Sequence, residues 1–212
     1  MEFSLFLKNI PKIVKEILPA TDAHLKMVPP ERIDFVQKQG FLNTIPKKAA
    51  VLMLLYPKQN KTHLALIVRN SYPGIHASQI AFPGGKVELY DANLGETALR
   101  ETHEEIGVPK EKVSLVRAFS EVYIPPSNYL VSPFLGFSQE ELDFILNAEE
   151  VSGLIELPLE QFLDESTVVK VNMSTSYATN IEVPAFQIGD HLVWGATAMM
   201  MSELKEIIKK TM

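Results

Sequence analysis

The chain has 212 residues, 46% of them hydrophobic, which suits one large domain or a core domain with an added terminal helix. Its 20 basic and 26 acidic residues give a net charge of −6, so it has no general field for nucleic acid, although a local metal ion could still let it bind an anionic small molecule. The absence of cysteine excludes disulfides and thiolate metal sites, so any metal must be held by oxygen or histidine.

The predicted elements begin with an amphipathic helix over residues 1–20, followed by a polar stretch to about Lys48. This start mixes Lys and Glu into the apolar pattern and is not a signal peptide. No apolar run approaches the roughly 18 residues of a membrane span, so no membrane partner is expected. We therefore expect a cytoplasmic protein with a lead-in over residues 1–45 and a core domain over residues 46–212; the oligomeric state is left open.

Strand patterns become dense after this lead-in. Apolar runs bounded by turn residues predict strands at 49–56, 62–69, 79–82, 113–119, 129–137 and 153–157. A hairpin follows, with Gly189 and Asp190 as its turn, and helices fit 94–106, 159–163 and 196–210. Because helices and strands interleave without a strict βαβ repeat, we expect an α+β fold with a mixed β-sheet between helices.

The helix at residues 94–106 has defined ends. Asn93 and Glu96 form a capping-box pattern at its start, and Gly107 followed by Pro109 closes it. One arc of the helix should face the core, and its members are Ala98, Leu99, Thr102 and Ile106.

Three carboxylates, Glu101, Glu104 and Glu105, share a different arc, because spacings of three and four residues stack side chains on one face. Carboxylates crowded in this way repel one another. A hard divalent cation relieves the repulsion, and oxygen ligands indicate Mg²⁺ or Mn²⁺. The alternative, an acidic helix that merely faces solvent, does not account for the neighbouring glycines and arginine in register.

Gly85, Asp91, Arg100 and Gly107 stand around these carboxylates in a pattern that resembles the Nudix box. The resemblance implies a Nudix-like α/β/α sandwich in which a loop–helix–loop binds metal and positions a diphosphate for attack by water. Asp91 and Arg100 are separated by one residue more than in the general pattern. The coenzyme A pyrophosphatase branch of the family shows a similar Asp and a similar extra residue.

Further segments resemble that branch, and together they span roughly residues 49–203: 76–86, 124–137, 149–164 and 193–200. The branch implies hydrolysis of coenzyme A to 3′,5′-ADP and 4′-phosphopantetheine. Ser78 stands where the branch usually has glycine, and a second arginine expected near Gly74 is missing. These differences leave room for ADP-ribose or a dinucleotide as the substrate. A third alternative is a binding module without turnover, which the intact carboxylates disfavour.

The resemblance also implies roles for individual residues. Glu101 and Glu105 are expected as metal ligands, Glu104 as a ligand or a supporting group, and the Gly85 carbonyl as a further ligand. Arg100 is expected to orient a carboxylate of the box, since a charge-assisted pair holds a ligand's geometry.

The general base is left open between Glu101 and Glu150, although Glu149 and Glu150 could equally form a solvated loop. Arg69 and Lys86, together with Gly84 and Gly85 in the loop, are candidates for binding the substrate. His76 is expected to be structural and His103 to have no catalytic part. Trp194 and residues 199–201 are expected to pack in the core.

Overall fold

Two β-sheets organise the chain in the computed structural model, which describes residues 1–34, 45–70, 79–174 and 180–212. The larger, eight-stranded sheet contains β1 (Lys47–Lys58), β2 (Lys61–Arg69), β3 (Ile80–Ala81), β4 (Gly84–Lys86), β5 (Ser114–Ala118), β6 (Val122–Ile124), β7 (Tyr129–Phe137) and β8 (Val151–Pro158). The smaller sheet contains β9 (Val168–Met173), β10 (Ile181–Ile188) and β11 (His191–Trp194).

The larger sheet is mixed, with its main strands in the order β3-β2-β1-β7-β5. β1 and β7 are parallel, and the other pairs are antiparallel. β1 changes its antiparallel partner along its length. Its last residues, from Leu55, pair with β2, whereas Ala49 to Val51 pair with β4. This change of partner puts β4 beside the start of β1, where the helix at residues 94–106 packs.

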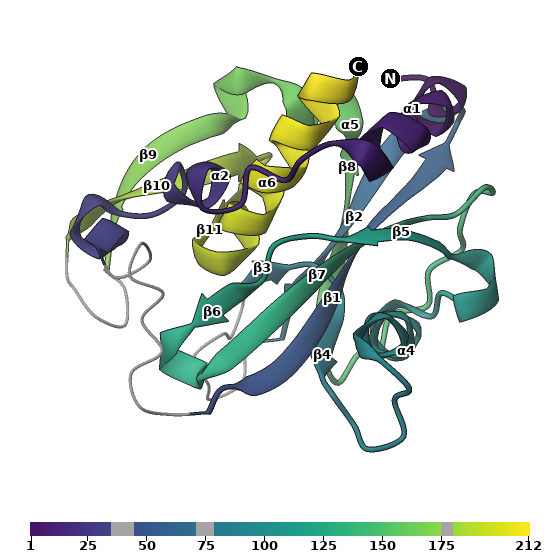
Figure 1. Cartoon of the computed structure of the whole chain (residues 1–212), viewed down its shortest axis with the longest axis horizontal. Coiled ribbons are helices and arrows are strands. Elements are labelled where there is room, and N and C mark those ends of the chain that lie inside the picture. Colours follow the sequence, from purple (N-terminus) through teal and green to yellow (C-terminus); the bar gives the residue numbers. More distant parts are fainter. Residues whose placement is uncertain (35–44, 71–78, 175–179) are drawn as a thin grey trace.

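The helices are α1 (Phe3–Lys15), α2 (Thr21–Leu25), α4 (Leu94–Ile106), α5 (Leu159–Leu163) and α6 (Gly195–Thr211). Four short 3₁₀ helices complete the described elements: η1 (Pro30–Arg32), η2 (Lys110–Lys112), η3 (Pro125–Ser127) and η4 (Glu165–Thr167). α4 lies on one side of the larger sheet, and α1 and α6 lie on the other (Figure 1). The structure therefore confirms the predicted α+β fold with a mixed sheet between helices.

The central strands supply core residues to both faces, because side chains alternate along a strand. On β1, Leu52 and Leu54 pack in the cluster that contains the apolar arc of α4. Met53 and Leu55 pack in the cluster that contains α1 and α6. A strand buried on both faces carries a nearly continuous apolar run, which is how residues 49–56 read in the sequence.

The N-terminal helix is shorter than predicted. It ends at Lys15 rather than continuing to residue 20. Arg117 on β5 donates hydrogen bonds to the carbonyls of Ile13, Val14 and Glu16, which lie in and just beyond the last turn of α1. A cation at this position satisfies carbonyls that the helix leaves without partners, so a contact from a distant strand fixes the end of α1.

Three strands were not predicted: β4, β6 and β9. β4 and β6 have three residues each, and β4 contains two glycines, which strand patterns disfavour. None of the described helices combines the length and the apolar character that crossing a membrane requires.

Candidate active site

α4 and β4 together form the candidate site. The side chain of Asn93 accepts a hydrogen bond from the backbone of Glu96 at 3.1 Å, and Gly107 ends α4 in the left-handed conformation. Both predicted helix ends are confirmed. The predicted core-facing arc is also buried, from Ala98 to Ile106. α4 is thereby fixed in rotation, and its acidic arc faces β4 and the solvent beyond it.

Glu101 lies against the backbone of Gly85. A Cβ atom at position 85 would come within 2.5 Å of the Glu101 carboxylate, so only glycine allows this approach without a shift. The side chain is largely buried, at 8% exposure. Burial raises the pKa of Glu101, opposed by the guanidinium of Arg100 and supported by Glu104 and Glu150.

Glu105 lies one turn further along α4 and is 1% exposed. One of its oxygens accepts a hydrogen bond from the backbone N–H of Gly84 at 2.8 Å, and the other lies 3.5 Å from Nη1 of Arg69. Burial raises the pKa of Glu105 to about 7, opposed by these two contacts and supported by the charges of Glu101 and Glu150. Glu101 and Glu105 are therefore two buried, mutually repelling carboxylates.

Arg100 connects the helix to the loop before it. All five N–H groups of its guanidinium are used. Nε and Nη2 donate to Asp91, Nη1 donates to Glu101 and Glu104, and Nη2 also donates to the Lys86 carbonyl, each at 2.9 Å. Hydrogen bonding from Arg100 holds the pKa of Asp91 well below its usual range. Arg100 thus has no N–H group left for a substrate and is suited to hold carboxylates in place.

The remaining predicted residues lie at different depths. Glu104 is exposed and contacts Arg100, so it does not share the buried position of Glu101 and Glu105. Lys86 extends toward solvent and pairs with Glu88 at 2.9 Å. Glu150 is exposed at the start of β8. It is close enough for its charge to raise the pKa values of the two buried carboxylates.

The oxygen atoms of these carboxylates are chemically suited to a divalent cation, but the side chains do not converge on one position for it. Among the described residues, no three His, Cys, Asp or Glu side chains are placed to hold a metal ion together. Arg100 is part of the reason, because its Nη1 atom donates a hydrogen bond to one oxygen of Glu101 and to one oxygen of Glu104. Two buried carboxylates beside the Gly85 backbone remain, and a hard cation is the partner that such oxygen atoms suit.

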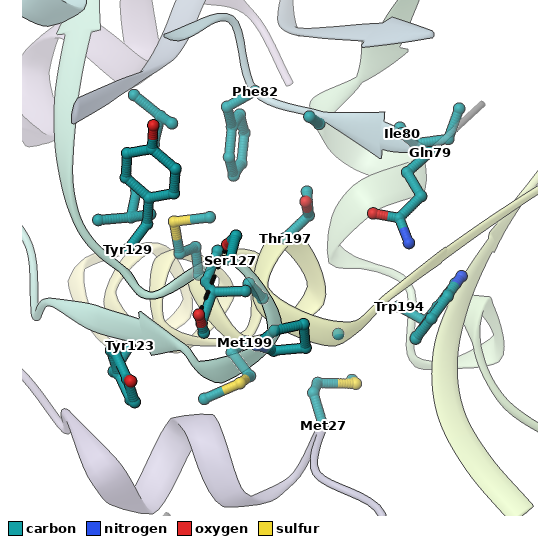
Figure 2. A pocket seen from close by; sticks show the side chains of 18 of the residues that line it. Met27, Gln79, Ile80, Phe82, Tyr123, Ser127, Tyr129, Trp194, Thr197 and Met199 are labelled. Carbon is teal, nitrogen blue, oxygen red and sulfur yellow. Dashed lines mark hydrogen bonds between the residues drawn. The ribbon is translucent and has the colours of Figure 1, made fainter. Parts of the chain in front are cut away.

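A cavity of about 360 Å³ lies next to these carboxylates. Arg69 and Gly84 line it, and both also contact Glu105. Figure 2 shows Trp194 and Gln79 on one side of the cavity and Tyr123 and Tyr129 on the other. The site therefore joins a charged edge to a large, mainly apolar chamber.

Sequence reasoning missed this cavity. Trp194 was expected in the core but is only half-buried and lines the chamber. Of the three methionines expected to pack, Met200 and Met201 are buried, while Met199 is half-buried and lines the cavity with Met200. The segment at residues 193–200 resembles the coenzyme A branch, but the other residues that line the cavity come from six separate parts of the chain. His76, Ser78 and Gly74 lie outside the described residues.

Comparisons with known proteins identify the family of this chain. A family model described as the NUDIX domain matches residues 46–176. A Nudix hydrolase named NudL from Yersinia enterocolitica is 33% identical over 158 residues, covering 74% of this chain and 80% of the relative.

Two solved structures share the fold. The Nudix hydrolase RenU from M. smegmatis has a TM-score of 0.54 and 18% identity, covering 78% of this chain and 87% of RenU. A MutT/nudix family protein from Enterococcus faecalis has a TM-score of 0.54 and 17% identity, covering 89% of this chain and 73% of that protein. The family match contains α4 and β4, and with them Arg100 and the carboxylates Glu101, Glu104 and Glu105. The chain therefore belongs to the Nudix family and is a hydrolase that acts on diphosphate linkages.

Proposed function

We propose that this hydrolase cleaves the diphosphate of coenzyme A, or of an acyl derivative, to 3′,5′-ADP and 4′-phosphopantetheine. The observation that carries the proposal is that the buried carboxylates and a cavity of about 360 Å³ share Arg69 and Gly84. A diphosphate beside Arg69 therefore has room for a bulky substituent. The resemblance of residues 79–86 to the coenzyme A branch supports this substrate, because β3 and β4 form part of the shared wall.

In this proposal, Glu101, Glu105 and the Gly85 carbonyl hold a divalent cation, Mg²⁺ or Mn²⁺. When bound, the cation neutralises charge on the phosphoryl oxygens and lowers the pKa of a bound water. Arg100 holds Glu101 against Gly85 and contributes no contact to substrate, since all its donors are in use. Glu104 supports Arg100 from the solvent side.

In this arrangement Arg69 contacts Glu105 and lines the cavity, where its guanidinium suits the negative charge of a substrate diphosphate. Lys86 is less suited to the same part, because its ammonium group is exposed and paired with Glu88. Gly84 contributes its N–H to Glu105 rather than to a phosphate. We therefore assign phosphate binding to Arg69.

Between the two candidates for the general base, we favour Glu150. One oxygen of Glu101 is paired with Arg100 at 2.9 Å, and its carboxylate packs on Gly85 as a ligand would. Glu150 is exposed, and its side chain accepts a longer hydrogen bond of 3.3 Å from Asn147. A base needs an oxygen that can reach a proton, which an exposed side chain provides.

The deciding experiment is a product analysis. The protein is incubated with Mg²⁺ or Mn²⁺ and, separately, coenzyme A, ADP-ribose and a diadenosine polyphosphate, and the products are identified by mass. We expect 3′,5′-ADP and 4′-phosphopantetheine from coenzyme A at the highest kcat/KM. The Glu105→Gln variant is the control that ties the activity to this site. A preference for ADP-ribose would replace the proposal with the second substrate class, and no turnover of any substrate would favour a binding module.

A further inference from the structure

Much of the cavity wall comes from outside the region that matches the family. The family model covers residues 46–176, which include the carboxylates, Arg69 and Gly84. The flanking segments on both sides add eight apolar side chains to the wall: Met27, Val28, Pro29, Val183, Trp194, Ala196, Met199 and Met200. The flanking segments thus complete a chamber that the family-matched region also lines, through Ile80, Phe82 and Tyr129 among others.

The chemistry of this wall limits what can enter. Among the described lining residues, the charged ones are Arg32 and Arg69, and none is an Asp, Glu or Lys. A cationic group would meet only positive charge. The described lining offers few uncharged polar side chains, among them Gln79, Ser127 and Thr197, within a mainly apolar wall. A ligand rich in hydroxyl groups would bury several of them without partners, which would weaken its binding.

The wall also suits a flexible chain better than a flat ring. Aromatic rings lie at two sides of the cavity, with Trp194 beside Gln79 on one side and Tyr123 and Tyr129 on the other, and the thioethers of Met27 and Met199 lie between them (Figure 2). A base stacked on one of these rings would leave the opposite side of the wall without contact, whereas an extended arm can reach both sides. Unbranched thioether side chains adapt to irregular apolar groups, which a branched aliphatic arm presents.

We infer that the cavity binds the pantetheine arm of the substrate and that the adenosine half lies outside it. This assignment rests on the proposed function, because it divides the two halves of coenzyme A between the chamber and the surface beyond the carboxylates. The amide of Gln79 and the hydroxyls of Ser127 and Thr197 supply polar groups for the two amides of the arm. The flanking segments then act as the specificity elements of the enzyme.

Trp194 makes a direct test possible, because it is the only tryptophan in the chain. Its fluorescence reports on this wall alone. The full-length protein with Mg²⁺ is titrated with 4′-phosphopantetheine and, separately, with 3′,5′-ADP, neither of which contains a diphosphate linkage to hydrolyse. We expect a saturable change with 4′-phosphopantetheine and no change with 3′,5′-ADP. The reverse pattern, or no response to either compound, would overturn the assignment.

A cavity-filling variant gives a second, independent readout. Ala196 lines the cavity from α6, so Ala196→Leu should exclude part of the arm. Each methylene kept out of an apolar site costs about fourfold in affinity, and two cost about 16-fold. We therefore expect the inhibition constant of 4′-phosphopantetheine to rise at least tenfold, with that of 3′,5′-ADP unchanged.

Ala118→Leu is the matched control, because Ala118 is exposed on β5 and does not line the cavity. It should leave both inhibition constants unchanged. Equal losses for both products in Ala196→Leu, or a loss for 3′,5′-ADP alone, would contradict the assignment. A failure of the proposed function can be distinguished from a failure of this assignment, because the product analysis would then show no hydrolysis of coenzyme A. The fluorescence titrations need no turnover and report on the cavity in either case.

Discussion

Replacing Gly85 with alanine perturbs the site where β4 touches α4. The new Cβ atom would lie 2.5 Å from Cδ and Oε2 of Glu101 and 2.7 Å from Oε1. Ordinary contact begins near 3.4 Å, so the carboxylate must retreat by roughly 1 Å. A misplacement of this size in a reacting group can cost on the order of 100-fold in rate. We therefore expect Gly85→Ala to lower kcat by about 100-fold.

The same substitution should leave the fold nearly intact, because the atoms it meets are the far end of one flexible side chain. The free energy of unfolding should change by less than about 1 kcal/mol, since alanine also restricts the unfolded chain. The assay compares kcat for the wild type and the variant at saturating Mg²⁺, with thermal unfolding measured on the same samples.

Gly84→Ala is the matched control and should behave in the opposite way. Gly84 has a φ of 153°, and a Cβ there would meet the Ala50 carbonyl oxygen at 2.4 Å and the backbone of Val51 at 2.6 Å. These are strand atoms that cannot move aside, so stability should fall clearly. A folded Gly85→Ala protein with wild-type kcat would refute the view that the position of Glu101 controls the reaction.

The other predictions concern individual side chains and the cation. Glu105→Gln should lower kcat at least ~100-fold while the protein stays folded. A chelator should abolish wild-type activity until Mg²⁺ or Mn²⁺ is added back. Full turnover in excess chelator would exclude the metal-dependent mechanism. Burial raises the pKa of Glu105 to about 7 without metal, above its value of about 4.3 in an unfolded chain. The contribution of Glu105 to the free energy of unfolding is therefore fully present below pH ~4.3 and is lost as the pH rises toward 7. Thermal unfolding in chelator should show this pH dependence in the wild type and not in Glu105→Gln. Arg69→Ala should lower kcat/KM roughly 10- to 150-fold for coenzyme A and for dephospho-coenzyme A alike, because Arg69 contacts Glu105. A loss with coenzyme A alone would instead indicate that Arg69 binds the 3′-phosphate. Glu150→Gln should lower kcat without weakening Mg²⁺ binding measured by calorimetry, and unchanged kcat would return the role of base to Glu101.

The sequence was sufficient to predict α4 because its signals are local. The cap at Asn93, the left-handed Gly107 and the apolar arc from Ala98 to Ile106 all lie within one short segment. Helical periodicity then places the acids on a shared side without any knowledge of the tertiary structure. The same periodicity cannot say which acid is buried. Glu101 and Glu105 are covered because β4 packs over them, and β4 is too short and too rich in glycine to predict.

Features made by distant segments were beyond the sequence pattern. The end of α1 depends on Arg117, which lies about a hundred residues further along the chain. Trp194 is predicted as a core residue because large aromatic side chains are usually buried. Only the arrangement of residues 27–32, β3, β6 and α6 leaves it facing a cavity. The division at residue 45 stays a prediction; α1 packs on α6 and β2, so the lead-in contributes to the same core.

The extra residue between Asp91 and Arg100 has a structural explanation in the loop itself. One oxygen of Asp91 accepts hydrogen bonds from the Glu88 backbone, the Thr97 hydroxyl and Nη2 of Arg100, while the other accepts from Nε. The aspartate thus closes its own turn and still reaches the guanidinium through two parallel bonds. The hydrogen bonds from Arg100 lower the pKa of Asp91, which favours the charged form of the carboxylate in this pair. Asp91 therefore holds Arg100 in place through two parallel hydrogen bonds, although it lies one residue further from Arg100 than in the general Nudix pattern, and Arg100 in turn holds Glu101.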